Sequence, residues 1–118
     1  MHMIKTEEYT LDELIHITPT IKDFYRRVKK ERQLTYEEIS VLYYVAQSDE
    51  NTIPVCHIAQ RSFLKPYFLS KAVQKLKDKG YLDKKRSQID QRQIYIEVTD
   101  EQRIMIQSLL TDLQYFID

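Results

Sequence analysis

Four polar side chains at helical spacing follow Pro66 and form the first group of residues that could do chemistry. This polar face consists of Tyr67, Ser70, Lys71 and Gln74. A glutamine amide can pair with adenine, a lysine can donate to guanine or to a phosphate, and hydroxyl groups can contact phosphates or either base. The residue types therefore fit contact with DNA bases, although they specify no base sequence. The alternative is the solvated face of an ordinary surface helix.

The second group is the stretch Asp90 to Arg92. On an extended chain, residues two apart project from the same side, so the Asp90 carboxylate can orient the Arg92 guanidinium. An arginine held at a hairpin tip suits the narrow minor groove of A·T-rich DNA, and Lys84, Lys85 and Arg86 would flank the phosphates. Taken alone, the pattern is better explained as a solvated hairpin with an ion pair worth under about 1 kcal/mol. After a helix-turn-helix, DNA contact becomes the better explanation.

Charge is divided unevenly along the chain. The 118 residues have no formal net charge, yet residues 61–92 contain ten basic and three acidic side chains, a net +7, which leaves −7 on the rest. Such asymmetry is expected when one face contacts a polyanion. The candidate DNA-binding residues are Lys65, Tyr67, Ser70, Lys71, Gln74, Lys75, Lys84, Lys85, Arg86, Asp90, Gln91 and Arg92.

Three capping boxes predict where long helices begin. Thr10, Thr35 and Thr99 are each followed three residues later by Glu or Gln, which lets the threonine oxygen accept a backbone N–H while the longer side chain reaches back. Apolar residues recur near a 3.6-residue period after each box. We therefore expect terminal helices over about 10–30 and 100–117, and another helix from Thr35 to a polar cluster near residue 48.

Between these helices the chain predicts a helix-turn-helix over about 55–80 and a wing over about 81–98. A short helix is expected over 53–62, Pro66 suits the first turn of the next helix, and Gly80 suits a left-handed C-cap. After Gly80 the apolar period changes to two, as in Ile94 and Ile96, which indicates a β-hairpin. The fold class is mainly α with a small β-hairpin (α+β), a single winged helix-turn-helix domain over residues 1–118.

The terminal helices contain more apolar positions than the hydrophobic core of one small domain needs. One face would pack on the body and the other on a second copy, whose two-fold symmetry would place two recognition helices roughly 34 Å apart. The alternative is that both faces serve one thick core. The candidate dimerisation residues are Leu11, Leu14, Ile15, Ile106, Leu109, Leu110, Leu113, Phe116 and Ile117.

Several function classes lack support in the sequence. The chain has one glycine, no phosphate-binding loop and no His and carboxylate cluster, so we expect neither an enzyme nor a metal or other cofactor. No apolar stretch is long enough for a membrane span, and the first residues do not resemble a signal peptide, so a cytoplasmic location is expected. The lone Cys56 is better explained as a small buried hydrophobe than as a redox sensor.

The runs Leu34–Ile39 and Lys65–Asp78, followed by Lys84–Ser87 and Asp90–Arg92, closely resemble the staphylococcal accessory regulator (SarA) family. The resemblance covers almost the whole chain. It implies a MarR-like winged-helix homodimer in the cytoplasm that binds double-stranded, A·T-rich promoter DNA. It further implies control of virulence genes, often by repression of another regulator. The alternatives are a ligand- or redox-responsive MarR-type repressor and a winged-helix protein-interaction module that binds no DNA.

The family's wing motif of aspartate, glutamate and arginine corresponds to Asp90, Gln91 and Arg92, and its upstream wing arginine to Arg86. Gln91 departs from the motif by removing a charge, which leaves the Asp90 and Arg92 pair intact. Some relatives sense oxidation through a cysteine in the first helix. This chain has none there, so the resemblance assigns no such role to Cys56.

Overall fold

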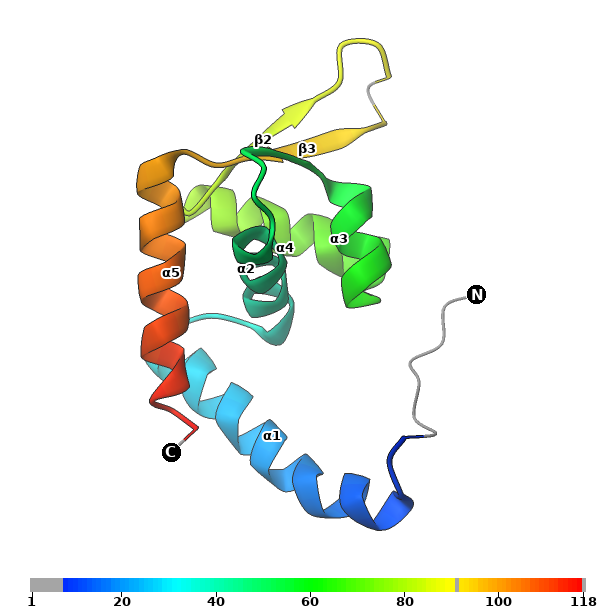
Figure 1. Ribbon diagram of the computed structural model, residues 1–118, viewed down its shortest axis with the longest axis vertical. Coiled ribbons are helices and arrows are strands. Elements are labelled where there is room, and N and C mark those ends of the chain that lie inside the picture. The colour runs from blue at the N-terminus through cyan, green and yellow to red at the C-terminus, as the bar shows by residue number, and fades with distance from the viewer. Residues whose placement is uncertain (1–7, 91, 118) are drawn as a thin grey trace.

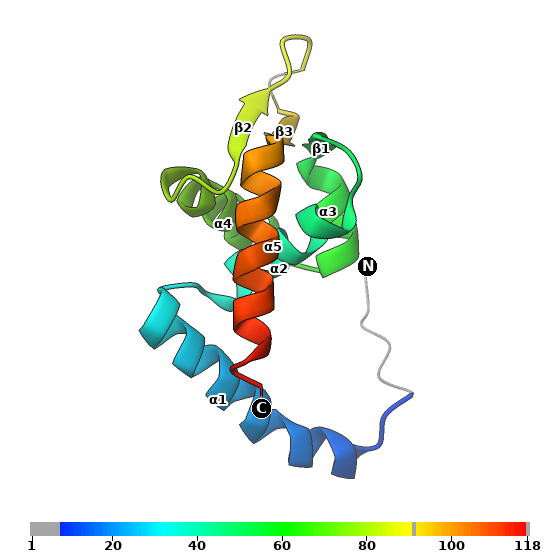
Figure 2. The ribbon, with the colours of Figure 1, turned by 60° about the vertical axis from the view of Figure 1, so that its left-hand side comes forward.

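A computed structural model describes residues 8–90 and 92–117. Within these residues the chain forms five helices and a small three-stranded sheet, which carries a long loop at its far end (Figures 1 and 2). The elements in order are α1 (Leu11–Arg32), α2 (Tyr36–Gln47), β1 (Thr52–Pro54), α3 (Val55–Ser62), α4 (Pro66–Asp78), β2 (Asp83–Arg86), β3 (Ile94–Glu97) and α5 (Asp100–Gln114). The mainly helical fold with a helix-turn-helix and a wing is the predicted class.

The sheet contains one strand that we did not predict. Strand β1 pairs antiparallel with β3, which places Ile53 opposite Ile96, and β2 pairs with the other side of β3. The expected start of a helix at Ile53 was therefore wrong, because α3 begins at Val55. A three-residue strand that ends at Pro54 has no alternating pattern of its own, and its partner lies more than forty residues away in sequence.

The three predicted caps are present, but only one is a complete capping box. Thr99 accepts the backbone N–H of Gln102 at 3.1 Å, and the Gln102 side chain accepts the Thr99 N–H at 2.9 Å. Thr10 and Thr35 also accept the expected N–H groups, at 3.1 and 3.2 Å. Their hydroxyls donate to the carboxylates of Glu13 and Glu38. Local chemistry therefore fixes the starts of α1, α2 and α5.

Helix α4 has both of its ends set by residue type. Pro66 occupies its first turn, where no N–H is needed. At its other end Gly80 adopts φ +86°, and the N–H groups of Gly80 and Tyr81 donate to the carbonyls of Lys77 and Leu76 at 3.0 Å. Since a Cβ on Gly80 would meet nothing within 4 Å, the left-handed backbone and not crowding favours glycine there.

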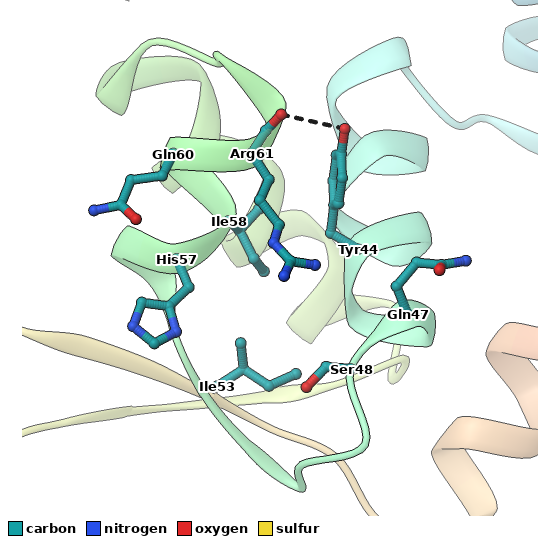
Figure 3. A pocket seen from close by; sticks show the side chains of 8 residues that line it. All are labelled: Tyr44, Gln47, Ser48, Ile53, His57, Ile58, Gln60 and Arg61. Atoms are coloured by element: carbon teal, nitrogen blue, oxygen red, sulfur yellow. Dashed lines mark hydrogen bonds between the residues drawn. The ribbon is translucent and has the colours of Figure 1, made fainter.

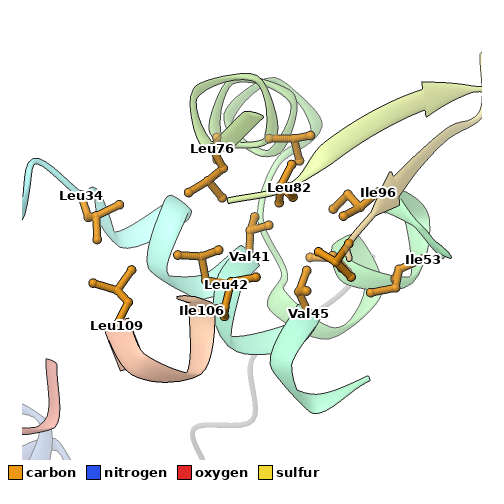
Figure 4. Close-up of a cluster of buried hydrophobic side chains, with 14 of the residues drawn as sticks. Leu34, Val41, Leu42, Val45, Ile53, Leu76, Leu82, Ile96, Ile106 and Leu109 are labelled. Atoms are coloured by element: carbon orange, nitrogen blue, oxygen red, sulfur yellow. The ribbon is translucent and has the colours of Figure 1, made fainter. Parts of the chain in front are cut away.

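The hydrophobic core is assembled around α2, whose Val41, Leu42 and Val45 are fully buried. Figure 4 shows side chains from α4, α5 and the sheet packing on them. This core also contains three of the expected dimerisation residues, Ile106, Leu109 and Leu113, at 1, 7 and 4% exposure. These three side chains stabilise the protomer and offer almost no surface to a second copy. The two candidate rows on α5 are thus partly rows of one core.

Helix α1 extends away from this body (Figures 1 and 2). Val28 is its only buried residue, whereas Leu11 and Ile15 are 75 and 62% exposed. Near its C-terminal end Arg27 donates to the Phe116 carbonyl and lies over the Phe116 ring. The radius of gyration is 15.4 Å, against about 13.5 Å for a compact chain of this length. No helix among residues 8–90 and 92–117 is long and apolar enough to span a bilayer.

Candidate nucleic-acid interface

The outward face of α4 presents the polar side chains expected from the sequence. Leu69, Ala72, Val73 and Leu76 are 0–3% exposed and fix the opposite face in the core. As a result Tyr67 is 69% exposed, and Ser70 and Lys71 are exposed beside it. Buried packing therefore determines which way the polar face points.

Two α4 candidates are less available than the sequence suggested. The half-buried Gln74 donates from Nε2 to Asp78 Oδ1 at 2.9 Å, so its amide must release this bond before it can pair with a base. Lys75 is half-buried and, with Lys71 and Glu37, lines a small groove of about 120 Å³ beside the start of α2. Lys65, which precedes the helix, is exposed.

The loop between β2 and β3 is shaped by hydrogen bonds from Ser87 and Asp90. The Ser87 hydroxyl oxygen accepts the N–H groups of Ile89 and Asp90 at 3.2 Å. Asp90 Oδ1 accepts the Arg92 backbone N–H at 3.0 Å and Arg92 Nε at 3.3 Å, while the Arg92 side chain stays 93% exposed. The expected pair of aspartate and arginine is therefore formed. Gln91 lies outside the described residues.

A cleft lies between the wing and the helix-turn-helix, and residues of both line it. Ser70 of α4 and Arg92 of the wing both line this cleft, which has a volume of about 550 Å³ and lies against α3 and β3. The cleft thus brings Ser70 and Arg92 together on one concave surface, whereas Tyr67, Lys71 and Gln74 do not line it. Lys85 and Arg86 on β2 are exposed, and Lys84 is half-buried.

Cys56 lines the same cleft and is exposed, so its expected burial was wrong. The second position of α3 faces solvent, while Ile58, two residues later, fills the core. No group of three or more metal-ligating side chains occurs among the described residues.

Two of the ten basic residues in the segment 61–92 make contacts away from the cleft and the wing. Arg61 projects into a separate hollow between α2 and α3, of about 330 Å³, where Tyr44 donates to the Arg61 carbonyl at 3.3 Å (Figure 3). Lys79 Nζ lies 2.6 Å from Glu38 Oε1 and 2.5 Å from the Gln33 carbonyl oxygen. The charge that could face DNA is therefore smaller than the count for residues 61–92 suggests.

The pair of Glu38 and Lys79 links three helix ends. Gln33 caps α1, Glu38 lies in the first turn of α2, and Lys79 caps α4. Burial acts to raise the pKa of Glu38, but hydrogen bonds from Lys79 and Thr35 outweigh it and hold that pKa below its usual value. Glu38 is 1% exposed, so the contact holds the C-terminal end of α4 against the corner between α1 and α2.

Two apolar residues at this surface were not among our candidates. Phe68 is 47% exposed and packs edge to face on Tyr67, with ring centroids 5.4 Å apart. Ile89 is 99% exposed in the loop that ends the wing. A signal for Ile89 was available, because it is the only apolar residue between Leu82 and Ile94.

Comparison with known proteins identifies the family that has this arrangement. The sequence model described as transcriptional regulator SarA/Rot matches residues 23–109, which include every helix from α2 to α4 and the whole wing. The chain belongs to the SarA/Rot family. SarA/Rot proteins are transcriptional regulators, in agreement with the expectation that the chain is not an enzyme.

One relative in the SarA/Rot family is the HTH-type transcriptional regulator SarR of Staphylococcus aureus (strain USA300). It is 43% identical over 107 residues, which cover 91% of this chain and 93% of SarR. Among solved structures, the transcriptional regulator BldR from Sulfolobus solfataricus matches with a TM-score of 0.71 and 25% identity, over 98% of this chain and 83% of BldR.

A MarR family transcriptional regulator from Streptomyces coelicolor, solved in complex with DNA, matches with a TM-score of 0.70. Its identity is 16%, over 92% of this chain and 72% of that protein. At this identity the match concerns the fold alone. The SarA/Rot chain therefore has a MarR-like winged-helix fold.

Proposed function

We propose that this protein binds A·T-rich, double-stranded promoter DNA as a homodimer, with α4 in the major groove and the wing in the minor groove. The observation that carries the proposal is the cleft that Ser70 of α4 and Arg92 of the wing line together. One duplex can then contact the polar face of the helix and the guanidinium of the wing at once. The narrow minor groove of A·T-rich DNA has the strongest negative potential, which favours an inserted arginine.

The relatives support a role in transcription. SarR is named as an HTH-type transcriptional regulator, and the Streptomyces coelicolor protein of the same fold was solved in complex with DNA. By extension, this chain acts in the cytoplasm on promoters and represses or modulates genes for virulence regulators. The proposed DNA-binding residues are those on the outward face of α4 and on the wing.

The homodimer is supported by the apolar surface of α1. Leu11, Ile15, Ile17 and Ile21 are 45–75% exposed on a helix that extends from the body. A single exposed apolar residue needs no explanation, but a row of them along one helix is typical of an interface. A second copy has the same row, so two-fold pairing of α1 would cover both. Leu14, half-buried on the same helix, belongs to this surface.

The DNA proposal is tested by fluorescence anisotropy with two labelled duplexes of equal length, one A·T-rich and one G·C-rich. We expect tighter binding to the A·T-rich duplex. We also expect an affinity that falls with salt by about 0.9 log units per log unit of salt for each phosphate contact. Absence of binding, or an affinity that does not change with salt, would favour a protein-interaction module.

The homodimer is tested by sedimentation of an Ile15→Lys variant, since a lysine on the exposed apolar row places a charge in the proposed interface. Thr20→Lys is the matched control, because Thr20 is an exposed polar residue of the same helix. We expect Ile15→Lys to sediment mainly as a monomer at micromolar concentration and Thr20→Lys as a dimer. A wild-type protein that is monomeric at these concentrations would refute the dimer.

A further inference from the structure

The wing ends in an exposed isoleucine inside an otherwise polar segment. Ile89 is 99% exposed, the highest value among the large apolar side chains of the described residues. Every other residue from Asp83 to Gln93 is polar or charged. Figures 1 and 2 show that the loop between β2 and β3 projects beyond the body of the protein. This apolar side chain therefore stands at one extremity of the molecule, and no packing within the protomer explains it.

The backbone on both sides of Ile89 is held by specific hydrogen bonds. Ser87 Oγ accepts the N–H groups of Ile89 and Asp90 at 3.2 Å. The Ser87 N–H donates to the Gln93 carbonyl, and the Gln93 N–H donates to the Asp90 carbonyl, both at 3.0 Å. The loop is therefore a hydrogen-bonded turn that exposes Ile89. Arg92, which Asp90 orients, follows three residues later.

Position distinguishes Ile89 from an ordinary exposed apolar residue. Scattered apolar side chains on a surface need no explanation, and the apolar row on α1 is explained by a second copy. Ile89 is separated from that row by the whole body and shares a short loop with an arginine suited to the minor groove. Proteins that enter the minor groove often insert an apolar side chain between base steps, which partly unstacks them and bends the duplex.

We propose that Ile89 enters the minor groove beside Arg92 and wedges against a base step. The proposal rests on the DNA-binding function proposed above and adds a second role for the wing. Arg92 supplies attraction to the groove, and Ile89 deforms the DNA. Flexible pyrimidine–purine steps such as TA unstack most easily, so Ile89 contributes to A·T selectivity through deformability, without a hydrogen bond to any base.

The affinity test compares Ile89→Ala and Ile89→Val with Gln88→Ala, the adjacent exposed residue of the same loop. Burial of one methylene is worth a factor of about four in affinity. We expect Ile89→Val to weaken binding to an A·T-rich duplex about fourfold and Ile89→Ala, which lacks three carbons, up to about sixtyfold, while Gln88→Ala changes it less than twofold. The dependence on salt should stay as in the wild type, because no phosphate contact is lost. Equal affinity of Ile89→Ala and wild type would refute the wedge.

The wedge itself is tested with A·T-rich duplexes in which single adenines are replaced in turn by 2-aminopurine, whose fluorescence rises when it unstacks. Wild-type protein should raise the fluorescence at one step in each half-site, and Ile89→Ala should not. Tight wild-type binding without a rise at any position would overturn the wedge and leave the DNA-binding proposal intact. No binding to any of these duplexes would overturn both.

Discussion

Helix α4 and the wing are held in place by opposite means. Helix α4 buries Leu69, Ala72, Val73 and Leu76 in the core, and its last turn is fixed by Gly80 and by the contact of Lys79 with Glu38. At the wing tip, residues 87–92, none of the described side chains is buried, and Ser87 and Asp90 shape the loop through local hydrogen bonds. We therefore expect substitutions under α4 to alter the fold and DNA binding together, and substitutions at the wing tip to alter DNA binding alone.

The largest expected effect is on stability and belongs to α4. Leu76 is fully buried, and Leu76→Ala should lower the free energy of unfolding by about 2–5 kcal/mol through lost burial and a cavity. Urea denaturation followed by circular dichroism measures it. Arg92→Ala is the comparison from the wing and should stay within about 0.5 kcal/mol of the wild type. Similar losses in the two variants would break the contrast between the two regions.

The next effect concerns the ion pair that fixes the end of α4. Glu38→Gln should lower the free energy of unfolding at neutral pH by about 1–3 kcal/mol, because the buried side chain loses a charged hydrogen bond to Lys79. Thermal melts on both proteins at pH 7 measure this difference.

The same pair gives a pH dependence. The pKa of Glu38 is lowered in the folded state, so its contribution to stability is present above the unfolded pKa, about 4.3 for glutamate. It is lost as pH falls through the lower folded pKa. The Tm of the wild type should therefore fall more than that of Glu38→Gln between pH 5 and pH 3, on the order of a few degrees. Parallel Tm profiles for the two proteins would contradict this role.

A smaller effect separates charge from fold on the outward face of α4. Lys71 is exposed, so Lys71→Ala should leave Tm unchanged and weaken DNA binding about tenfold, with the salt slope reduced by about 0.9. Lys22→Ala removes the same charge from exposed α1 and serves as the matched control. If both variants weaken binding equally, net charge and not the face of α4 is responsible.

The smallest expected effect is that of Asp90→Ala on DNA affinity, and its direction distinguishes two roles of Asp90. Asp90→Ala removes a negative charge from a surface proposed to face DNA, so electrostatics alone predicts tighter binding. If Asp90 instead orients Arg92, through the contacts at 3.0 and 3.3 Å, binding should weaken by a few-fold, in line with an exposed pair worth under about 1 kcal/mol. Anisotropy titrations at fixed salt decide between the two, and tighter binding would remove Asp90 from the mechanism.

Much of the fold could be predicted because its signals are local. Thr10, Thr35 and Thr99 each begin a helix at the residue expected, since a cap depends on a side chain three positions away. Gly80 ends α4 for an equally local reason. Strand β1 was missed because it forms by pairing with β3. The three residues Thr52–Pro54 contain no sequence pattern that indicates this pairing.

The exposed polar face of α4 was predicted from the sequence, but the contacts that hold its neighbours were not. Residue type and helical spacing were enough to place Ser70 and Lys71 on the outward face. Lys79 is not available to DNA because it binds Glu38, which lies forty-one residues away in sequence. This contact depends on tertiary packing that no local pattern encodes. The same holds for Leu113, whose row on α5 fits a core and an interface equally until the neighbouring helices are placed.

If α4 and the wing bind one duplex together, as we propose, the Arg92→Ala variant should show it. The measurement is the affinity of wild type and Arg92→Ala for A·T-rich and G·C-rich duplexes across a salt series. We predict that the variant keeps its Tm, loses about tenfold or more in affinity for A·T-rich DNA and most of its preference over G·C-rich DNA, and has a salt slope reduced by about 0.9. Unchanged affinity and unchanged preference in a folded variant would show that the wing takes no part in DNA binding.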